Sequence, residues 1–310
     1  CPMGRPPVAA SSFLPTELAM NVRIAMIVGW ASISPAIAQV RFTEEGALRG
    51  LLPFHAEPGM CAGFAAADYD ADGFLDVFVP TGSGQPDLLY RNLANGHFVE
   101  VGASAGVDSL DPHRSALWLD VDGDGDLDLM VLGADCYSPC DGTTRPLLFY
   151  RQDPPGRFSD VTCEAGLELP PAADINQHAA GISAGDADRD GDLDVVVCIW
   201  RDRTVFFRNE GDGTFCDATE ASGLSVVDAH GLDWQSVFHD FDGDGWQDLY
   251  FAIDFAPNRL MHNRGNGRFV DIAPRVGADI AMNGMGLALG DYDKDLDFDV
   301  YVTNIESLTG

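Results

Sequence analysis

The amino-acid sequence predicts an all-β chain built from repeated four-stranded antiparallel units, and three observations support this prediction. An acidic stretch of twelve residues recurs five times along the 310 residues. Runs of β-branched and aromatic residues follow each copy, and Asn-Gly and Asp-Gly pairs separate them, which signals tight hairpins because such turns need positive φ. No segment sustains the apolar period of a helix.

The acidic stretch has aspartate at its first, third, fifth and ninth positions, and four copies have glycine at the sixth. The copies read DYDADGFLDVFV, DVDGDGDLDLMV, DADRDGDLDVVV, DFDGDGWQDLYF and DYDKDLDFDVYV. They begin at Asp68, Asp120, Asp186, Asp240 and Asp291. Recurrence of one unit at a nearly constant spacing is the signature of a repeat architecture.

Each unit has the same predicted order of strands. The first strand is a small and apolar stretch before the aspartates: AGFAAA, SALWL, GISAG, SVFH or GLALG. The second strands are residues 77–79, 129–132, 195–199, 249–253 and 300–302. Third strands are LLYRN, LLFYR, VFFRN and RLMHN, and fourth strands are NGHFVEV, PGRFSDV, DGTFCDA and NGRFVDI. Four antiparallel strands per repeat predict a β-propeller, with the acidic turn between the first and second strands of each blade.

The two ends of the repeat indicate that the ring extends beyond this sequence. VRFTEEGA resembles the fourth-strand segment GTFCDATEASGL, so we expect an orphan outer strand near residues 40–45 that closes the ring. The fifth unit has no third strand before Gly310. We therefore expect residues 39–310 to hold four full blades, a partial fifth and the orphan strand, as a fragment of a larger propeller. A complete five-bladed ring is the alternative.

The amino end has the pattern of an exported protein. In MNVRIAMIVGWASISPAIA, Arg23 precedes an apolar stretch too short to span a membrane, and Ala36-Ile37-Ala38 has the form of a cleavage site. We expect residues 1–38 to be an upstream extension and signal peptide, and the mature chain to be extracellular, periplasmic or on the cell surface. A buried or membrane-anchoring helix is the alternative. Export permits disulfides, and we expect one between Cys136 and Cys140.

The net charge of −31 bears on the class of partner. It argues against nucleic acid, whose phosphates would be repelled, and against anionic membrane surfaces. We expect no membrane insertion. Such a charge suits a protein that binds cations.

The alternating carboxylates predict cation sites, because they surround a turn with oxygen ligands and glycine permits the sharp bend. Several carboxylates in a flexible cage favour calcium over magnesium. The expected ligands are Asp68, Asp70, Asp72, Asp76, Asp120, Asp122, Asp124, Asp128, Asp186, Asp188, Asp190, Asp194, Asp240, Asp242, Asp244, Asp248, Asp291, Asp293, Asp295 and Asp299. Solvated acidic turns without metal are the alternative. Leu296 replaces the glycine of the fifth copy, which predicts a left-handed residue and a weaker site.

These motifs resemble the FG-GAP or VCBS repeats of integrin α-like propellers. DFAPNRLMHNRGNGRFVDIA, together with MGLALGDYD, resembles the secreted ASPIC/UnbV-type, cartilage-acidic-protein-like propellers. The resemblance covers residues 40–310. It implies calcium at the aspartate turns and extracellular binding or adhesion, and it implies no particular reaction.

Four histidines precede the first strands of successive units: His55, His113, His178 and His230. Their place predicts a ligand-binding mouth of the central channel on the face opposite the acidic turns, whereas caps for loops are the alternative. The sequence has no nucleophile elbow, phosphate-binding loop or His-Glu-x-x-His motif. The first hypothesis is therefore a binding or adhesion module for an extracellular protein or glycan. The alternatives are a polysaccharide hydrolase or lyase that uses the histidine mouth, and a lectin.

Overall fold

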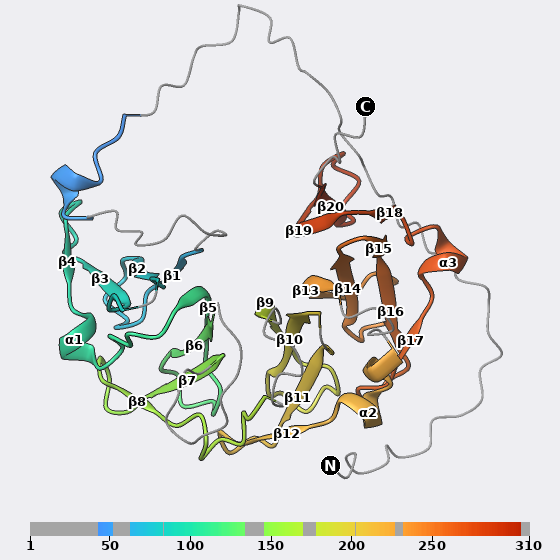
Figure 1. Ribbon diagram of the computed structural model, residues 1–310, viewed down its shortest axis with the longest axis horizontal. Helices are drawn as coiled ribbons and strands as arrows, with labels where there is room; N and C mark the ends of the chain where they lie inside the picture. The colour runs from blue at the N-terminus through green and yellow to red at the C-terminus, as the bar shows by residue number, and fades with distance from the viewer. Residues whose placement is uncertain are drawn as a thin grey trace, which may run out of the picture.

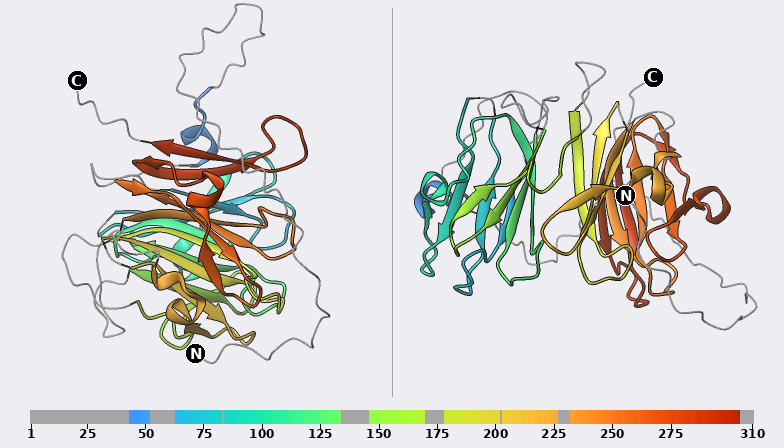
Figure 2. Two further views of the ribbon diagram at one scale, coloured as in Figure 1. Left: turned by 90° about the vertical axis from the view of Figure 1, so that its right-hand side faces the viewer. Right: turned by 90° about the horizontal axis from the view of Figure 1, so that it is seen from below.

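The computed structural model describes residues 43–51, 63–82, 84–133, 146–169, 178–201, 203–226 and 232–304. These residues form six antiparallel sheets, and we call five of them units 1 to 5 in chain order. The sheets stand side by side around a common centre, with their first strands innermost and their last strands on the outside (Figure 1). Figure 2 shows the same sheets from the side. The arrangement is consistent with propeller blades, and it does not close into a ring within the described residues.

Units 1 to 4 each have four strands that pair in chain order. Unit 1 consists of β1 (Ala65–Ala67), β2 (Asp76–Val79), β3 (Leu88–Asn92) and β4 (Phe98–Glu100). Unit 2 consists of β5 (His113–Leu119), β6 (Asp128–Gly133), β7 (Leu147–Gln152) and β8 (Phe158–Asp160). Unit 3 consists of β9 (His178–Gly185), β10 (Asp194–Trp200), β11 (Val205–Asn209) and β12 (Phe215–Asp217). Unit 4 consists of β13 (Asp233–His239), β14 (Asp248–Ile253), β16 (Arg259–Asn263) and β17 (Phe269–Asp271).

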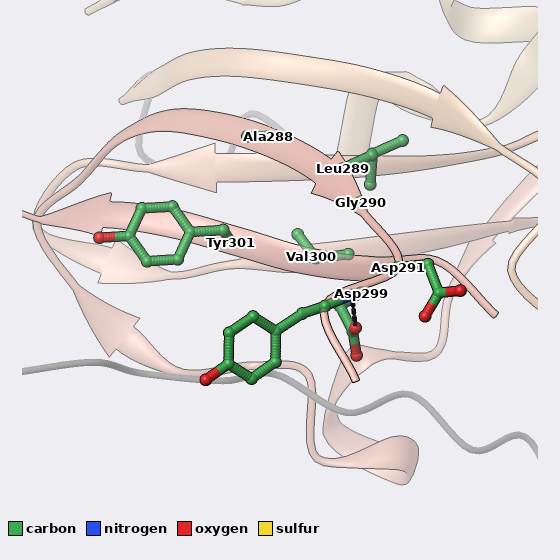
Figure 3. Close-up of a pocket in the computed structure, with 8 residues that line it drawn as sticks. Ala288, Leu289, Gly290, Asp291, Asp299, Val300 and Tyr301 are labelled. Atoms are coloured by element: carbon green, nitrogen blue, oxygen red, sulfur yellow. Dashed lines mark hydrogen bonds between the residues drawn. The ribbon is translucent and has the colours of Figure 1, made fainter. Parts of the chain in front are cut away.

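Unit 5 is a hairpin of β19 (Gly284–Gly290) and β20 (Asp299–Asn304) in the described residues. A two-stranded pairing of β15 (Ala256–Pro257) with β18 (Ala281–Met282), which the sequence did not predict, lies beside units 4 and 5. Near the acidic turn of unit 5, a pocket of about 340 Å³ lies over β20, lined by residues that include Leu289, Tyr292 and Tyr301 (Figure 3).

The acidic turns connect the first and second strands of every unit, as the sequence predicts. The register pairs Leu119 with Asp128 in unit 2 and Gly185 with Asp194 in unit 3. Each second strand therefore begins at the ninth-position aspartate itself, one residue earlier than the apolar run suggests.

Short helical turns follow the fourth strands, and they are too short to leave a periodic pattern in the sequence. They are α1 (Gly102–Ala105), α2 (Thr219–Ser222) with the adjoining η2 (Leu224–Val226), and α3 (Ala273–Val276), and a similar turn, η1 (Ala47–Arg49), precedes unit 1. Left-handed Gly106, Gly166 and Gly223 follow such turns, and a Cβ on each would approach a carbonyl of the next unit's fourth strand within 2.7, 2.7 and 3.0 Å. Glycine is therefore required where neighbouring units meet.

The segment near residues 40–45 was expected to form an outer strand. Its described part, residues 43–45, is not a strand and leads into η1. Left-handed Gly50 ends this turn, and a Cβ there would collide with the carbonyl of Phe98 in β4. The segment therefore contacts unit 1 in the same way as the turn after each fourth strand contacts the following unit.

The apolar core lies between neighbouring units rather than at one centre. One cluster joins units 2 and 3 through residues such as Phe149 and Val197. Equivalent clusters join units 1 and 2, units 3 and 4, and units 4 and 5. Each fully buried Phe or Leu contributes about 1.5–3 kcal/mol, so face-to-face packing of the sheets stabilises the array. Of the helices in the described ranges, none is long and apolar enough to cross a membrane.

Candidate metal centres

The first aspartate of each acidic turn holds the turn closed. Its carboxylate accepts a hydrogen bond from the backbone N–H at position 6 in all five units. The donors are Gly73 (2.8 Å), Gly125 (3.1 Å), Gly191 (3.2 Å), Gly245 (2.8 Å) and Leu296 (3.2 Å). The conformation of each acidic turn therefore depends on its first aspartate and on a residue at position 6 that allows the backbone to turn sharply.

Position 6 is left-handed in every turn. The glycines have φ between 89° and 100°, and Leu296 has φ 76°. The prediction of a left-handed leucine is thus confirmed, at a cost on the order of 1–2 kcal/mol. Position 4 is left-handed as well, and there Ala71, Arg189 and Lys294 stand where glycine would fit best. The sequence does not reveal this second left-handed position, because no single residue type marks it.

The ninth-position aspartates lie beneath the turns rather than at their surface. Asp76, Asp128, Asp194 and Asp248 are no more than 2% exposed. In unit 3, Asp194 accepts the N–H of Ala187 at 3.0 Å and that of Asn209 at 2.9 Å. Each of the other three accepts the backbone N–H groups of the residues at the two equivalent positions of its own unit. Burial raises the pKa of Asp194 to about 8 and the pKa of each of the other three to about 6.

Each of the first four turns brings at least three of its predicted carboxylates together. Oxygens of the following groups lie within 4.8 Å of one another: Asp68, Asp70 and Asp76; Asp120, Asp122 and Asp128; Asp186, Asp188 and Asp190; Asp240, Asp242 and Asp248. Sequence-predicted ligands at positions 1, 3, 5 and 9 therefore converge without any contribution from distant segments.

The donor chemistry fits a hard cation. Oδ1 of Asp70, Asp186 and Asp188 is buried and has no hydrogen-bond partner among the described residues. Burial, followed by the nearby Asp190, raises the pKa of Asp188 to about 6. Unpartnered carboxylate oxygens beside other carboxylates are costly unless a cation or a proton neutralises them, and an all-oxygen donor set suits calcium.

A basic residue of the third strand faces the acidic turn in each of units 1 to 4. Arg91, Arg151, Arg208 and His262 share one register, one residue before the last of the strand. Nε of Arg91 lies 2.6 Å from Oδ2 of Asp70. The basic residue is visible in the sequences of the third strands, LLYRN, LLFYR, VFFRN and RLMHN. Only the structure shows that this residue lies beside the acidic turn.

In units 2, 3 and 4, the next residue of the third strand bonds the acidic turn to the preceding unit. Nδ2 of Asn209 donates to the carbonyl of Val121 in unit 2 at 2.8 Å and to that of Leu193 in its own unit at 3.3 Å. Gln152 and Asn263 make the corresponding pairs of bonds. We call these three side chains the inter-unit clasps. They connect consecutive acidic turns into one network.

The predicted histidine mouth is described in part. The register places His113 and His178 at the ends of their strands away from the acidic turns. His113 is 3% exposed, and its Nδ1 lies 2.5 Å from Oδ2 of the buried Asp87 in unit 1. It therefore joins two units. His55, His230 and the side chain of His178 lie outside the described residues, as do Cys136 and Cys140.

Disulfides occur elsewhere in the chain. Cys163 and Cys216 are both disulfide-bonded. Cys198 is a free thiol and fully buried, and burial raises its pKa above the ordinary range.

Comparison with known proteins assigns the repeat. Residues 68–131 and 240–302 match the family model of the FG-GAP-like repeat, and each match begins at the first aspartate of an acidic turn. These two segments are similar to FG-GAP-like repeats. They cover the acidic turns of units 1, 2, 4 and 5, and the matched segments end in the second strands β6 and β20.

Among curated proteins, the chain is similar to cartilage acidic protein 1. The human protein is 26% identical over 82% of this chain, and the mouse protein 25% identical over 78%. The chain spans 40% of the length of each of these relatives.

Solved structures show weaker similarity. A lectin of Agrocybe aegerita, from a structure on recognition of non-reducing terminal N-acetylglucosamine, is 19% identical with a TM-score of 0.45, covering 76% of this chain and 59% of the lectin. A rhamnogalacturonan lyase of Bacillus licheniformis is 16% identical with a TM-score of 0.42, covering 78% of this chain and 46% of the lyase. These scores are too low to transfer a function.

Proposed function

We propose that the chain is the calcium-binding β-propeller of a secreted protein and acts as a binding or adhesion module. The observation that carries the proposal is the convergence of carboxylates in four successive turns, where three buried oxygens have no partner among the described residues. Calcium has a structural role here: it neutralises the turns that the inter-unit clasps connect.

The proposal extends to the organisation of the chain. Residues 1–38 are an upstream extension and signal peptide, and residues 39–310 are four full blades, a partial fifth and an outer segment contributed by the chain start. The contact of Gly50 with unit 1 supports this arrangement, because it repeats the contact between consecutive units. The ligands are the motif aspartates, with the fifth site weakened by Leu296.

Binding is favoured over catalysis by the described histidine. An acid–base residue has to reach its substrate, whereas His113 is buried and bonded to Asp87. The partner is an extracellular protein or a glycan, and the recognising loops lie at the ends of the units away from the acidic turns.

Calcium dependence of folding tests the metal proposal. A site with a Kd of about 10⁻⁴ M contributes about 2.7 kcal/mol at 100 Kd of calcium, so chelation should lower the Tm by several degrees. Elemental analysis of the full chain should find calcium, and magnesium at the same concentration should restore less of the Tm. An unchanged melt in excess chelator together with no bound calcium would refute the proposal.

A glycan array with product analysis tests the binding role. Captured glycans should be recovered at their original length. Shortened products that disappear when His113, His178 and His230 are replaced with alanine, in a chain that still folds, would favour the enzyme hypothesis instead.

A further inference from the structure

Unit 4 differs from units 1, 2 and 3 at the basic residue that faces the acidic turn. Units 1 to 3 have Arg91, Arg151 and Arg208 at this register of the third strand, and unit 4 has His262. A guanidinium carries a permanent charge and has no lone pair to offer a metal, whereas a neutral imidazole is a common metal ligand. The substitution therefore changes the chemistry of the turn.

The ring of His262 points its Nδ1 at the carboxylates. Nδ1 forms a hydrogen bond of 3.1 Å with Oδ1 of Asp248 and lies 3.5 Å from Oδ2 of Asp242. Asp242, Asp244 and His262 each place a ligand atom within 4.8 Å of the others. The side chain of His262 is 20% exposed and that of Asp242 15%, whereas Asp244 is exposed, so an ion can reach the group from solvent.

These separations suit a small ion with mixed ligands. Around a tetrahedral ion with bonds of about 2.0 Å, neighbouring ligand atoms are about 3.3 Å apart, and the 3.5 Å between Nδ1 of His262 and Oδ2 of Asp242 is close to that value. One imidazole nitrogen with carboxylate oxygens is a donor set for zinc and similar transition metals, whereas carboxylates alone suit calcium or magnesium.

The ring is positioned by the strand that carries it. The backbone of His262 pairs with Val270 of β17. The adjacent Asn263 donates its backbone N–H to Oδ1 of Asp248 at 2.7 Å and its side chain to Ala187 of unit 3 at 2.8 Å. In unit 1 the same place is filled by Arg91, which is paired with Asp70 at 2.6 Å and Asp72 at 3.4 Å.

We propose that unit 4 binds a zinc-class divalent ion through Nδ1 of His262 and the carboxylates of Asp242 and Asp244, with Asp248 adjoining, and that the arginine-bearing units do not. This inference rests on the proposed cation binding at the acidic turns and assigns one of them a different metal.

Zinc stoichiometry of the full chain tests the inference. The folded protein, held in millimolar calcium, is dialysed against zinc buffered at low micromolar concentration, and bound zinc is measured by elemental analysis. The wild type should retain one equivalent more than His262→Arg, which restores the residue type of units 1 to 3. His262→Gln should lose the same equivalent, and this variant serves if the arginine perturbs folding.

Arg91→His is the matched gain-of-site variant. It places an imidazole over the turn of unit 1 and should add one zinc equivalent, whereas the other histidines are constant across all variants. Zinc content that is the same in wild type, His262→Arg and His262→Gln would overturn the inference, even if calcium binds as proposed. Zinc that depends on His262 in a chain that binds no calcium would support this site and refute the calcium proposal.

Discussion

Replacing Asn209 with alanine should destabilise the protein strongly, because this clasp joins units 2 and 3. The change removes the donor to the carbonyls of Val121 and Leu193, and the acceptor at 2.9 Å for the N–H of Gly211. Asn209 and Val121 are each 1% exposed, so water cannot readily replace the lost bonds. Each buried polar group left without a partner costs about 1–3 kcal/mol.

We therefore expect a total loss of about 2–4 kcal/mol. Asn92→Ala is the control: Asn92 occupies the same register in unit 1, but its Nδ2 donates to Leu75 of its own unit at 3.0 Å, at a more exposed site. Its loss should be close to about 1 kcal/mol, the value of an ordinary hydrogen bond.

Urea unfolding of both variants and the wild type in saturating calcium measures the difference. Hydrogen exchange adds the location: Asn209→Ala should accelerate exchange in the turns of units 2 and 3, whereas Asn92→Ala should affect unit 1. Equal losses of stability for the two variants would refute the idea that the bond between units, rather than the bond within a unit, is the costly one.

Three further predictions concern the acidic turns. Burial raises the pKa of Asp194 to about 8 and that of Asp248 to about 6. The folded, calcium-free chain therefore binds protons more tightly than the unfolded chain. Its free energy of unfolding should fall as the pH rises from about 4 to 8. Urea midpoints in chelator that increase over this range would contradict the assignment. Asp122→Ala in unit 2 should lower the Tm in calcium more than Asp293→Ala, since the fifth turn is already strained, and equal shifts would argue against a weakened fifth site. Leu296→Gly should stabilise the chain by about 0.5–1 kcal/mol, because Leu296 is 90% exposed and its backbone φ of 76° suits glycine. Unchanged or lower stability in chemical denaturation would show that the leucine is not strained.

The repeat and its turns were predictable because they are local. Alternating aspartates, a glycine and an apolar run lie within twelve residues, and the strands follow from the same short patterns, so the acidic turn between first and second strands could be placed before any sheet was seen. The left-handed conformation of Leu296 followed from the same local comparison with four glycines.

The sequence by itself determined the repeated four-stranded unit and the set of carboxylates that each turn brings together, because both depend on residues close in the chain. Only the tertiary structure decided what stands beside those carboxylates. The bond from Asn209 to Val121 spans 88 residues, and the pairing of His113 with Asp87 joins separate units. Such contacts arise when sheets stack face to face. The stacking depends on side chains from both units, and the sequence of one unit alone does not specify how it packs against the next.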